Sequence, residues 1–108
     1  MFVLELTRHC NHRCPHCYAV WGTPASFPGK PGRDGEMSTD EIRRLVDYLQ
    51  QETPVETIAL SGGEPLLRDD LPEIVGCLKE RGINPVIISN GRLLSAERIE
   101  LLRDARTF

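Results

Sequence analysis

Three short apolar segments alternate with three amphipathic helical patterns along this chain of 108 residues. From Phe2 to Thr7 a period of two gives one apolar face and one partly polar face. Thr57 to Ser61 and Pro85 to Ser89 are instead apolar runs typical of strands buried in a parallel sheet. The order strand, helix, strand, helix, strand, helix predicts repeated βα units with right-handed crossovers. The predicted fold class is therefore α/β, and the turns that follow the strands should share one edge of the sheet.

Capping signals set the expected helix boundaries. A serine or aspartate followed three residues later by glutamate marks two helix starts, at Ser38 and at Asp70. The first pattern predicts a helix over about 39–52, and Gly82 is expected to end the second helix. Ser95 is expected to cap the third.

Composition and length limit the functional classes. The formal net charge is -3 with both signs interspersed, which argues against a nucleic-acid surface. No apolar run approaches membrane length, and Glu5 interrupts any signal-peptide core, so no membrane partner is expected and the expected compartment is the cytoplasm. The chain is expected to form one domain, residues 1–108, with a long Gly- and Pro-rich loop at 18–37 that could act as a lid.

Cys10, Cys14 and Cys17 lie within eight residues, directly after the first predicted strand. Three thiolates in one loop can hold a soft metal while one coordination position stays without a protein ligand. Two metal sites fit this pattern: a zinc site completed by a neighbouring histidine, or a [4Fe-4S] cluster with one open iron. A disulfide is not favoured, because three cysteines cannot pair evenly and the expected compartment is reducing. Cys77 is interpreted as a small buried residue of the second helix.

The turn after the second strand reads Ser-Gly-Gly-Glu-Pro, residues 61–65. Gly62 and Gly63 would let the backbone approach a ligand closely, Glu64 can accept a hydrogen bond from an ammonium group, and Pro65 stiffens the exit from the turn. Taken alone, these residues could equally form an ordinary connection between a strand and a helix.

Together, the CxxxCxxC and GGEP motifs resemble those of the radical S-adenosylmethionine (radical SAM) superfamily. The resemblance covers essentially the whole chain, and it implies an incomplete parallel (β/α) barrel, with three of the six βα units of a radical SAM partial TIM barrel. It implies a [4Fe-4S] cluster on Cys10, Cys14 and Cys17. It also implies that S-adenosylmethionine (SAM) is bound by the aromatic residue before the third cysteine and by the turns after the second and third strands. The residues expected to bind SAM are therefore His16, Gly62, Gly63, Glu64, Pro65 and Asn90. For Asn90, in the turn Ser-Asn-Gly, a simple tight turn is an equal alternative.

The resemblance further implies an enzyme that generates a 5′-deoxyadenosyl radical, in the branches that modify peptides or proteins or build cofactors. The expected partners are SAM, a peptide or small-molecule substrate, and an external one-electron donor such as flavodoxin or ferredoxin. Because only half of the barrel is present, the chain is expected to be a fragment, a truncated product or half of a split enzyme that associates with its missing half or with itself. The alternatives are a catalytically inactive cluster-binding chain and a structural Cys/His zinc protein.

Overall fold

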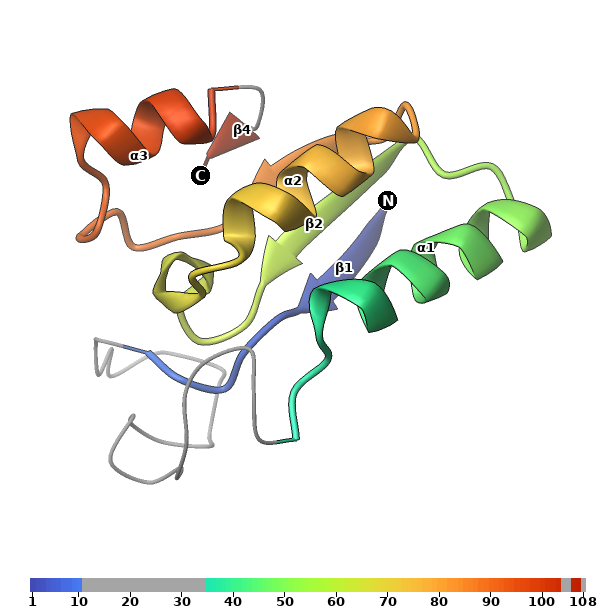
Figure 1. Ribbon diagram of the computed structural model, residues 1–108, viewed down its shortest axis with the longest axis horizontal. Coiled ribbons are helices and arrows are strands. Elements are labelled where there is room, and N and C mark those ends of the chain that lie inside the picture. Colours follow the sequence, from blue (N-terminus) through green and yellow to red (C-terminus); the bar gives the residue numbers. More distant parts are fainter. Residues whose placement is uncertain (11–34, 104–105, 108) are drawn as a thin grey trace.

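The computed structural model describes residues 1–10, 35–103 and 106–107, and they form a parallel sheet with helices packed on it (Figure 1). The strands pair in the order of the sequence, all parallel: β1 (Phe2–Glu5), β2 (Thr57–Ser61), β3 (Asn84–Ile87) and β4 (Arg106–Thr107). The predicted α/β class and the parallel sheet are confirmed. The sheet also contains β4, which follows the three strands that the sequence predicted.

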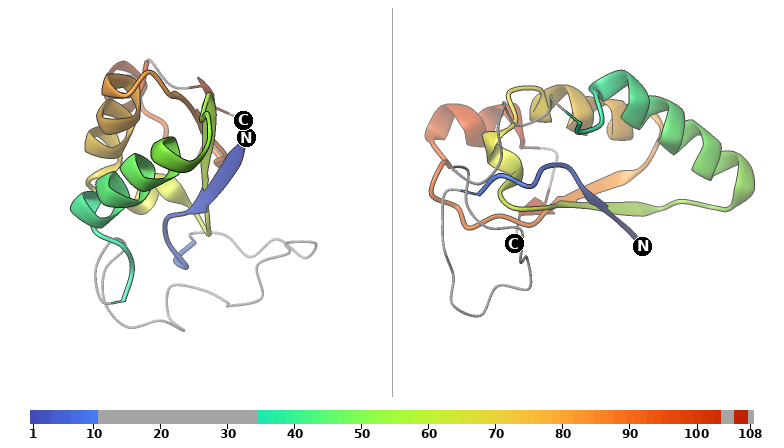
Figure 2. Two further views of the ribbon diagram at one scale, coloured as in Figure 1. Left: turned by 90° about the vertical axis from the view of Figure 1, so that its right-hand side faces the viewer. Right: turned by 90° about the horizontal axis from the view of Figure 1, so that it is seen from below.

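The helices lie on one face of the sheet, as both views in Figure 2 show. Their bounds are α1 (Thr39–Glu52), the short 3-10 helix η2 (Pro65–Leu67), α2 (Leu71–Glu80) and α3 (Ala96–Leu101). The strand register explains the core between the two layers. Leu4 pairs with Leu60, which pairs with Ile87, and all three side chains are buried beneath the helices.

The helices complete this core with the apolar residues that the periodicity predicts. Ile42 and Val46 of α1 are fully buried, and Leu71, Ile74, Val75 and Leu78 of α2 pack in the same cluster. Each large aliphatic side chain buried in this way stabilises the fold by about 1.5–3 kcal/mol relative to leaving it exposed. Packing of α1 and α2 therefore sets the positions of the strand ends on which a site could be built.

Three of the predicted helix boundaries are confirmed by their caps, among them Ser95, whose hydroxyl accepts a hydrogen bond from the Arg98 amide at the start of α3. The Ser38 hydroxyl accepts a hydrogen bond from the Glu41 amide, and the Glu41 carboxylate accepts one from the Ser38 amide, so the capping box is present. Gly82, with φ +71°, follows α2, and its amide and that of Ile83 donate to carbonyl groups of the last turn. This is the Schellman arrangement.

The capping box predicted from Asp70 and Glu73 is wrong. Asp70 does occupy the N-cap position of α2, but its side chain makes no capping hydrogen bond. The Asp70 carboxylate instead accepts hydrogen bonds from the Arg68 guanidinium and from the Thr39 hydroxyl. A charged donor binds a carboxylate more strongly than a neutral amide does, so Arg68 displaces the local cap.

Several expectations fall on parts of the chain outside the described residues. Residues 11–34 contain Cys14, His16 and Cys17, together with most of the predicted 18–37 loop. Among the described residues, no helix is both long enough and apolar enough to span a membrane.

Candidate functional site

The loop that follows β1 is hydrogen-bonded to the turn that follows β2. The Gly63 amide donates to the Thr7 carbonyl at 2.8 Å, and the Glu64 amide donates to the His9 carbonyl at 2.7 Å. Both loops leave the carboxyl ends of neighbouring parallel strands, at the lower edge of the sheet in Figure 1. Cys10 therefore directly follows a residue that is bonded to the Gly-Gly-Glu turn, as the shared edge predicted.

Gly62 and Gly63 are required by the protein's own backbone. A Cβ atom added to Gly62 would collide with the Thr7 carbonyl oxygen, and one added to Gly63 would collide with the His9 carbonyl. Gly62 also has φ +133°, a conformation that side chains strongly disfavour. We expected these glycines to make room for a ligand, whereas the space beside them holds the loop after β1. Contact of the two glycines with a ligand stays a prediction.

Glu64 is a fully buried acid whose carboxylate accepts three hydrogen bonds. Its Oε1 atom accepts from the Leu66 amide at 3.1 Å and from the Ser89 hydroxyl at 2.8 Å. Its Oε2 atom accepts from the Asn90 amide at 2.9 Å. Burial of a carboxylate is tolerable only where such donors compensate for the lost water. Glu64 thus joins the turn after β2 to the turn after β3.

The remaining predicted residues of these turns have clear local roles. Pro65 is buried and begins η2, where its fixed φ suits the first position of a helix. The Asn90 side chain accepts a hydrogen bond from the Arg92 amide, and Gly91 has φ +78°. This geometry fits the tight-turn interpretation of Asn90, and its contact with a cofactor stays a prediction.

Arg68 is a residue of this region that the sequence analysis missed. Its guanidinium is buried, donates to the Leu6 carbonyl at 2.9 Å and binds both carboxylate oxygens of Asp70 at 2.8 and 2.7 Å. Burial works against ionisation of Asp70, but hydrogen bonds from Arg68 and Thr39 outweigh it, so the pKa of Asp70 lies below its usual value. Arg68 thereby ties the end of β1 to the beginnings of α1 and α2. The available signal was a charged residue directly after the apolar run Pro-Leu-Leu and two positions before Asp70.

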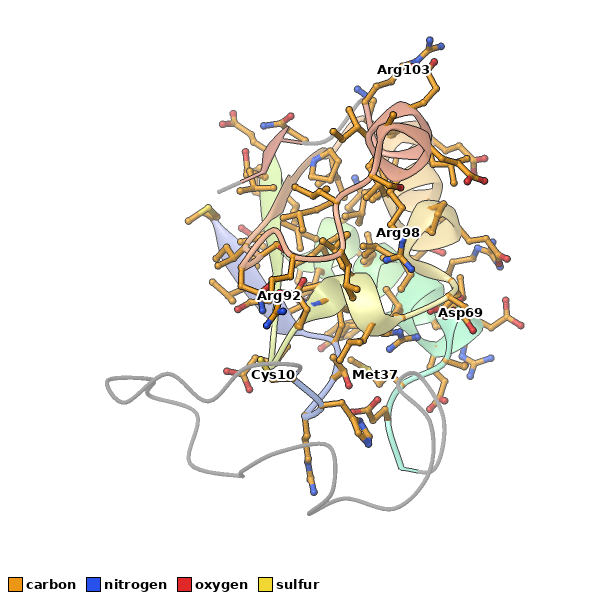
Figure 3. The ribbon with its side chains drawn as sticks, turned by 90° about the vertical axis from the view of Figure 1, so that its left-hand side faces the viewer. Cys10, Met37, Asp69, Arg92, Arg98 and Arg103 are labelled. Atoms are coloured by element: carbon orange, nitrogen blue, oxygen red, sulfur yellow. The ribbon has the colours of Figure 1, made fainter. Side chains whose placement is uncertain are left out.

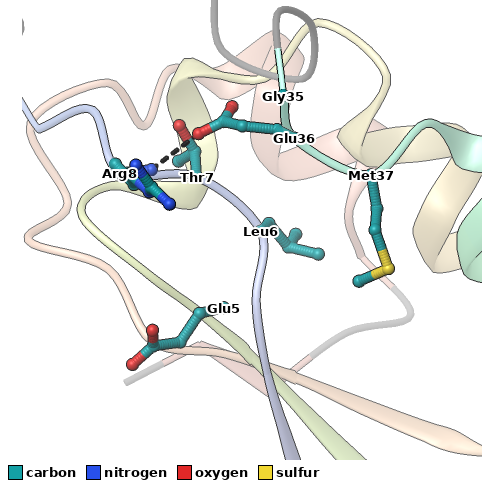
Figure 4. Close-up of a pocket in the computed structure, with 7 residues that line it drawn as sticks. All are labelled: Glu5, Leu6, Thr7, Arg8, Gly35, Glu36 and Met37. Atoms are coloured by element: carbon teal, nitrogen blue, oxygen red, sulfur yellow. Dashed lines mark hydrogen bonds between the residues drawn. The ribbon is translucent and has the colours of Figure 1, made fainter. Parts of the chain in front are cut away.

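A cavity of about 530 Å³ lies between the end of β1 and the segment that leads into α1 (Figure 4). Glu36 reaches across it and accepts a hydrogen bond from the Arg8 amide at 2.7 Å. The His9 ring lies 3.8 Å from the same carboxylate and 3.2 Å from the Thr7 hydroxyl. Arg8 and Glu36, which lie on either side of residues 11–34, are thus hydrogen-bonded to each other close to Cys10.

The two cysteines among the described residues differ in exposure, which bears on whether each could bind a metal. Cys10 is a free cysteine of intermediate exposure, whereas Cys77 is buried in α2, and burial raises the pKa of its thiol. Cys77 is thus a buried core residue, as predicted, and the role of Cys10 as a metal ligand stays a prediction. Within the described ranges, no group of three or more His, Cys, Asp or Glu side chains could hold a metal ion; Cys14 and Cys17 are outside them. Figure 3 shows Cys10 and Met37 toward the end of the molecule opposite Arg103.

Comparison with known proteins matches residues 4–108 to the model of the radical SAM superfamily. The Fe-coproporphyrin III synthase of Methanosarcina barkeri is 39% identical over 103 residues, which are 94% of this chain and 24% of that protein. The PqqA peptide cyclase of Rhodopseudomonas palustris is 39% identical over 104 residues, which are 95% of this chain and 25% of that protein. The chain therefore spans about a quarter of the length of these relatives.

Two solved structures share the fold. SuiB of Streptococcus suis, bound to its precursor peptide SuiA, matches with a TM-score of 0.72 and 17% identity over 97% of this chain and 22% of that chain. BtrN, in complex with AdoMet and 2-DOIA, matches with a TM-score of 0.68 and 27% identity over 97% of this chain and 42% of that chain. The arrangement of β1 to β4 and their helices is thus an arrangement found in radical SAM enzymes.

Proposed function

The chain belongs to the radical SAM superfamily, and from this premise we propose that it holds a [4Fe-4S] cluster on Cys10, Cys14 and Cys17 and binds SAM at the open iron. One observation carries the proposal. The hydrogen bond from the Glu64 amide to the His9 carbonyl brings the first cysteine beside the Gly-Gly-Glu turn. The proposal is supported because the proposed cluster ligand Cys10 and the turn proposed for SAM lie at one edge of the sheet.

The chain's own residues would bind and orient the cofactor. The turn from Gly62 to Pro65 would hold the methionine end of SAM, and His16 and Asn90 would line the same site. When bound, the cluster supplies the electron for reductive cleavage of SAM, which yields methionine and the 5′-deoxyadenosyl radical. The protein's contribution is to position the reactants and to exclude water.

The proposed reaction class is maturation of a cofactor, a peptide or a protein. Relatives at 36–39% identity include an Fe-coproporphyrin III synthase, a PqqA peptide cyclase and a probable GTP 3',8-cyclase, and the first two support this proposed reaction class. An external one-electron donor such as flavodoxin or ferredoxin would reduce the cluster. We propose the cytoplasm as the compartment, because thiolate ligands must stay reduced.

Anaerobic reconstitution of the intact protein with iron and sulfide tests the cluster. We expect a brown protein with close to one full cluster per chain. Cys10→Ala should lose most of the iron, because it removes one of three ligands. Cys77→Ala is the matched control and should keep it, since Cys77 is buried in α2. A colourless protein that retains zinc, or equal iron uptake by both variants, would overturn the assignment.

Formation of 5′-deoxyadenosine from SAM separates catalysis from binding alone. We expect the reduced, reconstituted protein to form this product and methionine in equal amounts. A protein that keeps its cluster and binds SAM without forming either product would be the catalytically inactive alternative. Chromatography of the quenched reaction measures both compounds.

A further inference from the structure

The Ser89 hydroxyl is the one side-chain donor that the described residues supply to the buried Glu64 carboxylate. We propose that Ser89 is a positioning residue of the SAM site: through Glu64 it fixes the turn after β3 against the turn after β2. This inference rests on the proposed function, because it assigns a role within the same site. It also gives Glu64 a role other than direct contact with the ammonium group of SAM.

The geometry determines the direction of the Ser89 hydroxyl. Its oxygen accepts a hydrogen bond from the Gly91 amide at 2.9 Å, so its single proton is left to be donated to Glu64 Oε1 at 2.8 Å. The hydroxyl thus connects the tight turn of residues 89–91 with the carboxylate on the neighbouring loop. Few side chains other than serine and threonine can accept and donate in this way at one atom.

The burial of Glu64 shows why this connection matters. The residue has no exposed surface, so its carboxylate is stabilised by protein donors alone. Two of these donors, Ser89 Oγ and the Asn90 amide, come from the loop after β3, and the third is the Leu66 amide. Hydrogen bonds to a charged acceptor are stronger than those between neutral groups. Glu64 therefore holds the two loops in one relative position.

The backbone transmits this position to the cysteine loop. The Glu64 amide donates to the His9 carbonyl, and Cys10 is the next residue. A shift of Glu64 would change the spacing between the Gly-Gly-Glu turn and the first cluster ligand. Loss of the Ser89 hydroxyl should accordingly weaken SAM binding and leave the cluster in place, because the main-chain bonds from Gly63 and Glu64 that hold the loop of Cys10 do not involve the hydroxyl.

The test compares four reconstituted proteins: wild type, Ser89→Ala, Glu64→Gln and the double variant. The affinity for SAM is measured from the SAM-induced change in the spectrum of the reduced cluster. We expect Ser89→Ala to raise the Kd about tenfold, the equivalent of one hydrogen bond to a charged group, with unchanged iron content. In the Glu64→Gln background, the same change should raise the Kd less than about threefold, because both residues act through one contact.

Two further variants separate positioning from general stability. Ser89→Thr keeps the hydroxyl and should stay within about threefold of the wild-type Kd. Ser95→Ala removes the hydroxyl that caps α3 and should lower the unfolding temperature, yet it should not change the Kd. Thermal unfolding of every variant shows whether the comparison is made on folded protein.

The outcomes distinguish this inference from the proposed function. A wild-type protein without a cluster, or with a cluster spectrum insensitive to SAM, overturns the proposed function and the inference together. A SAM-sensitive wild type with an unchanged Kd in Ser89→Ala overturns the inference alone. The inference also fails if the effects of Ser89→Ala and Glu64→Gln multiply independently, or if Ser89→Ala loses iron.

Discussion

The turns after β2 and β3 lie at the same edge of the sheet but are held in different ways. The turn after β2 is bonded through its backbone to residues 7 and 9 and leads into the buried residues Glu64 to Leu66. In the turn after β3, Ser89 is half-buried and Asn90 is exposed, and both donate to the carboxylate of Glu64. Main-chain hydrogen bonds thus position the turn after β2, whereas the Glu64 side chain links the turn after β3 to it.

This difference predicts unequal sensitivity to substitution. Changes in the first turn must disturb the end of β1 and Cys10, because main-chain atoms of the two loops are in direct contact. Changes in the second turn can be absorbed by an exposed loop. The following substitutions test that inequality.

Arg68→Met should have the largest effect, a loss of about 3 kcal/mol in the free energy of unfolding. It leaves Asp70 and the Leu6 carbonyl without their buried donor, and breaking a buried ion pair by removing one partner typically costs about 3–5 kcal/mol. The lower end of this energy range applies because the Asp70 side chain is 26% exposed. Urea unfolding measures the change. Arg103→Met is the control, since the exposed Arg103 pair with Glu100 should contribute less than about 1 kcal/mol.

The same pair predicts how the effect of Arg68→Met depends on pH. The pKa of Asp70 is lowered in the folded protein, so its ionised form contributes stability above the usual value of 3.8 and loses that contribution as the pH falls through the lowered pKa. The difference between wild type and Arg68→Met should therefore be full at neutral pH and shrink in acid. A difference that stays constant with pH would contradict this account of the pair.

Gly63→Ala and Gly91→Ala make the same change in the two turns. At Gly63 the new Cβ collides with the His9 carbonyl, and we expect a loss of about 2 kcal/mol together with reduced iron uptake. At Gly91 the new Cβ would meet only the Leu94 side chain at 3.8 Å, so the cost is the positive φ alone, about 1 kcal/mol. Equal losses of stability and of iron in both variants would contradict the difference between the turns.

Asn90→Ala should have the smallest effect on stability, about 0.5 kcal/mol. The substitution removes the hydrogen bond that the Asn90 side chain accepts from the Arg92 amide, but it keeps the main-chain bond to Glu64. Thermal unfolding measures the change. A loss as large as that of Gly63→Ala would show that the second turn is embedded as firmly as the first.

The sequence predicted the features that depend on local patterns. The bounds of α1, its capping box, the end of α2 at Gly82 and the buried residues of β2 all follow from residues a few positions apart. The placement of Cys10 beside the Gly-Gly-Glu turn also followed, because parallel strands bring their carboxyl ends to one edge.

The features that the sequence did not reveal join residues far apart in the chain. Arg68 binds the Leu6 carbonyl 62 residues away, and Ser89 binds Glu64 across 25 residues. Asp70 looked like a helix cap because its neighbours matched a local motif, and a charged donor, absent from that motif, took its carboxylate instead. Such competition between local and tertiary partners is decided by packing, which periodicity does not encode.

Electron paramagnetic resonance of the reduced, reconstituted protein, recorded with and without SAM, tests the central claim most directly. The account predicts the signal of a reduced [4Fe-4S] cluster whose spectrum changes when SAM is added, because SAM would bind the iron that has no cysteine ligand. A protein without an iron-sulfur signal, or a cluster signal that stays the same at saturating SAM, would contradict it.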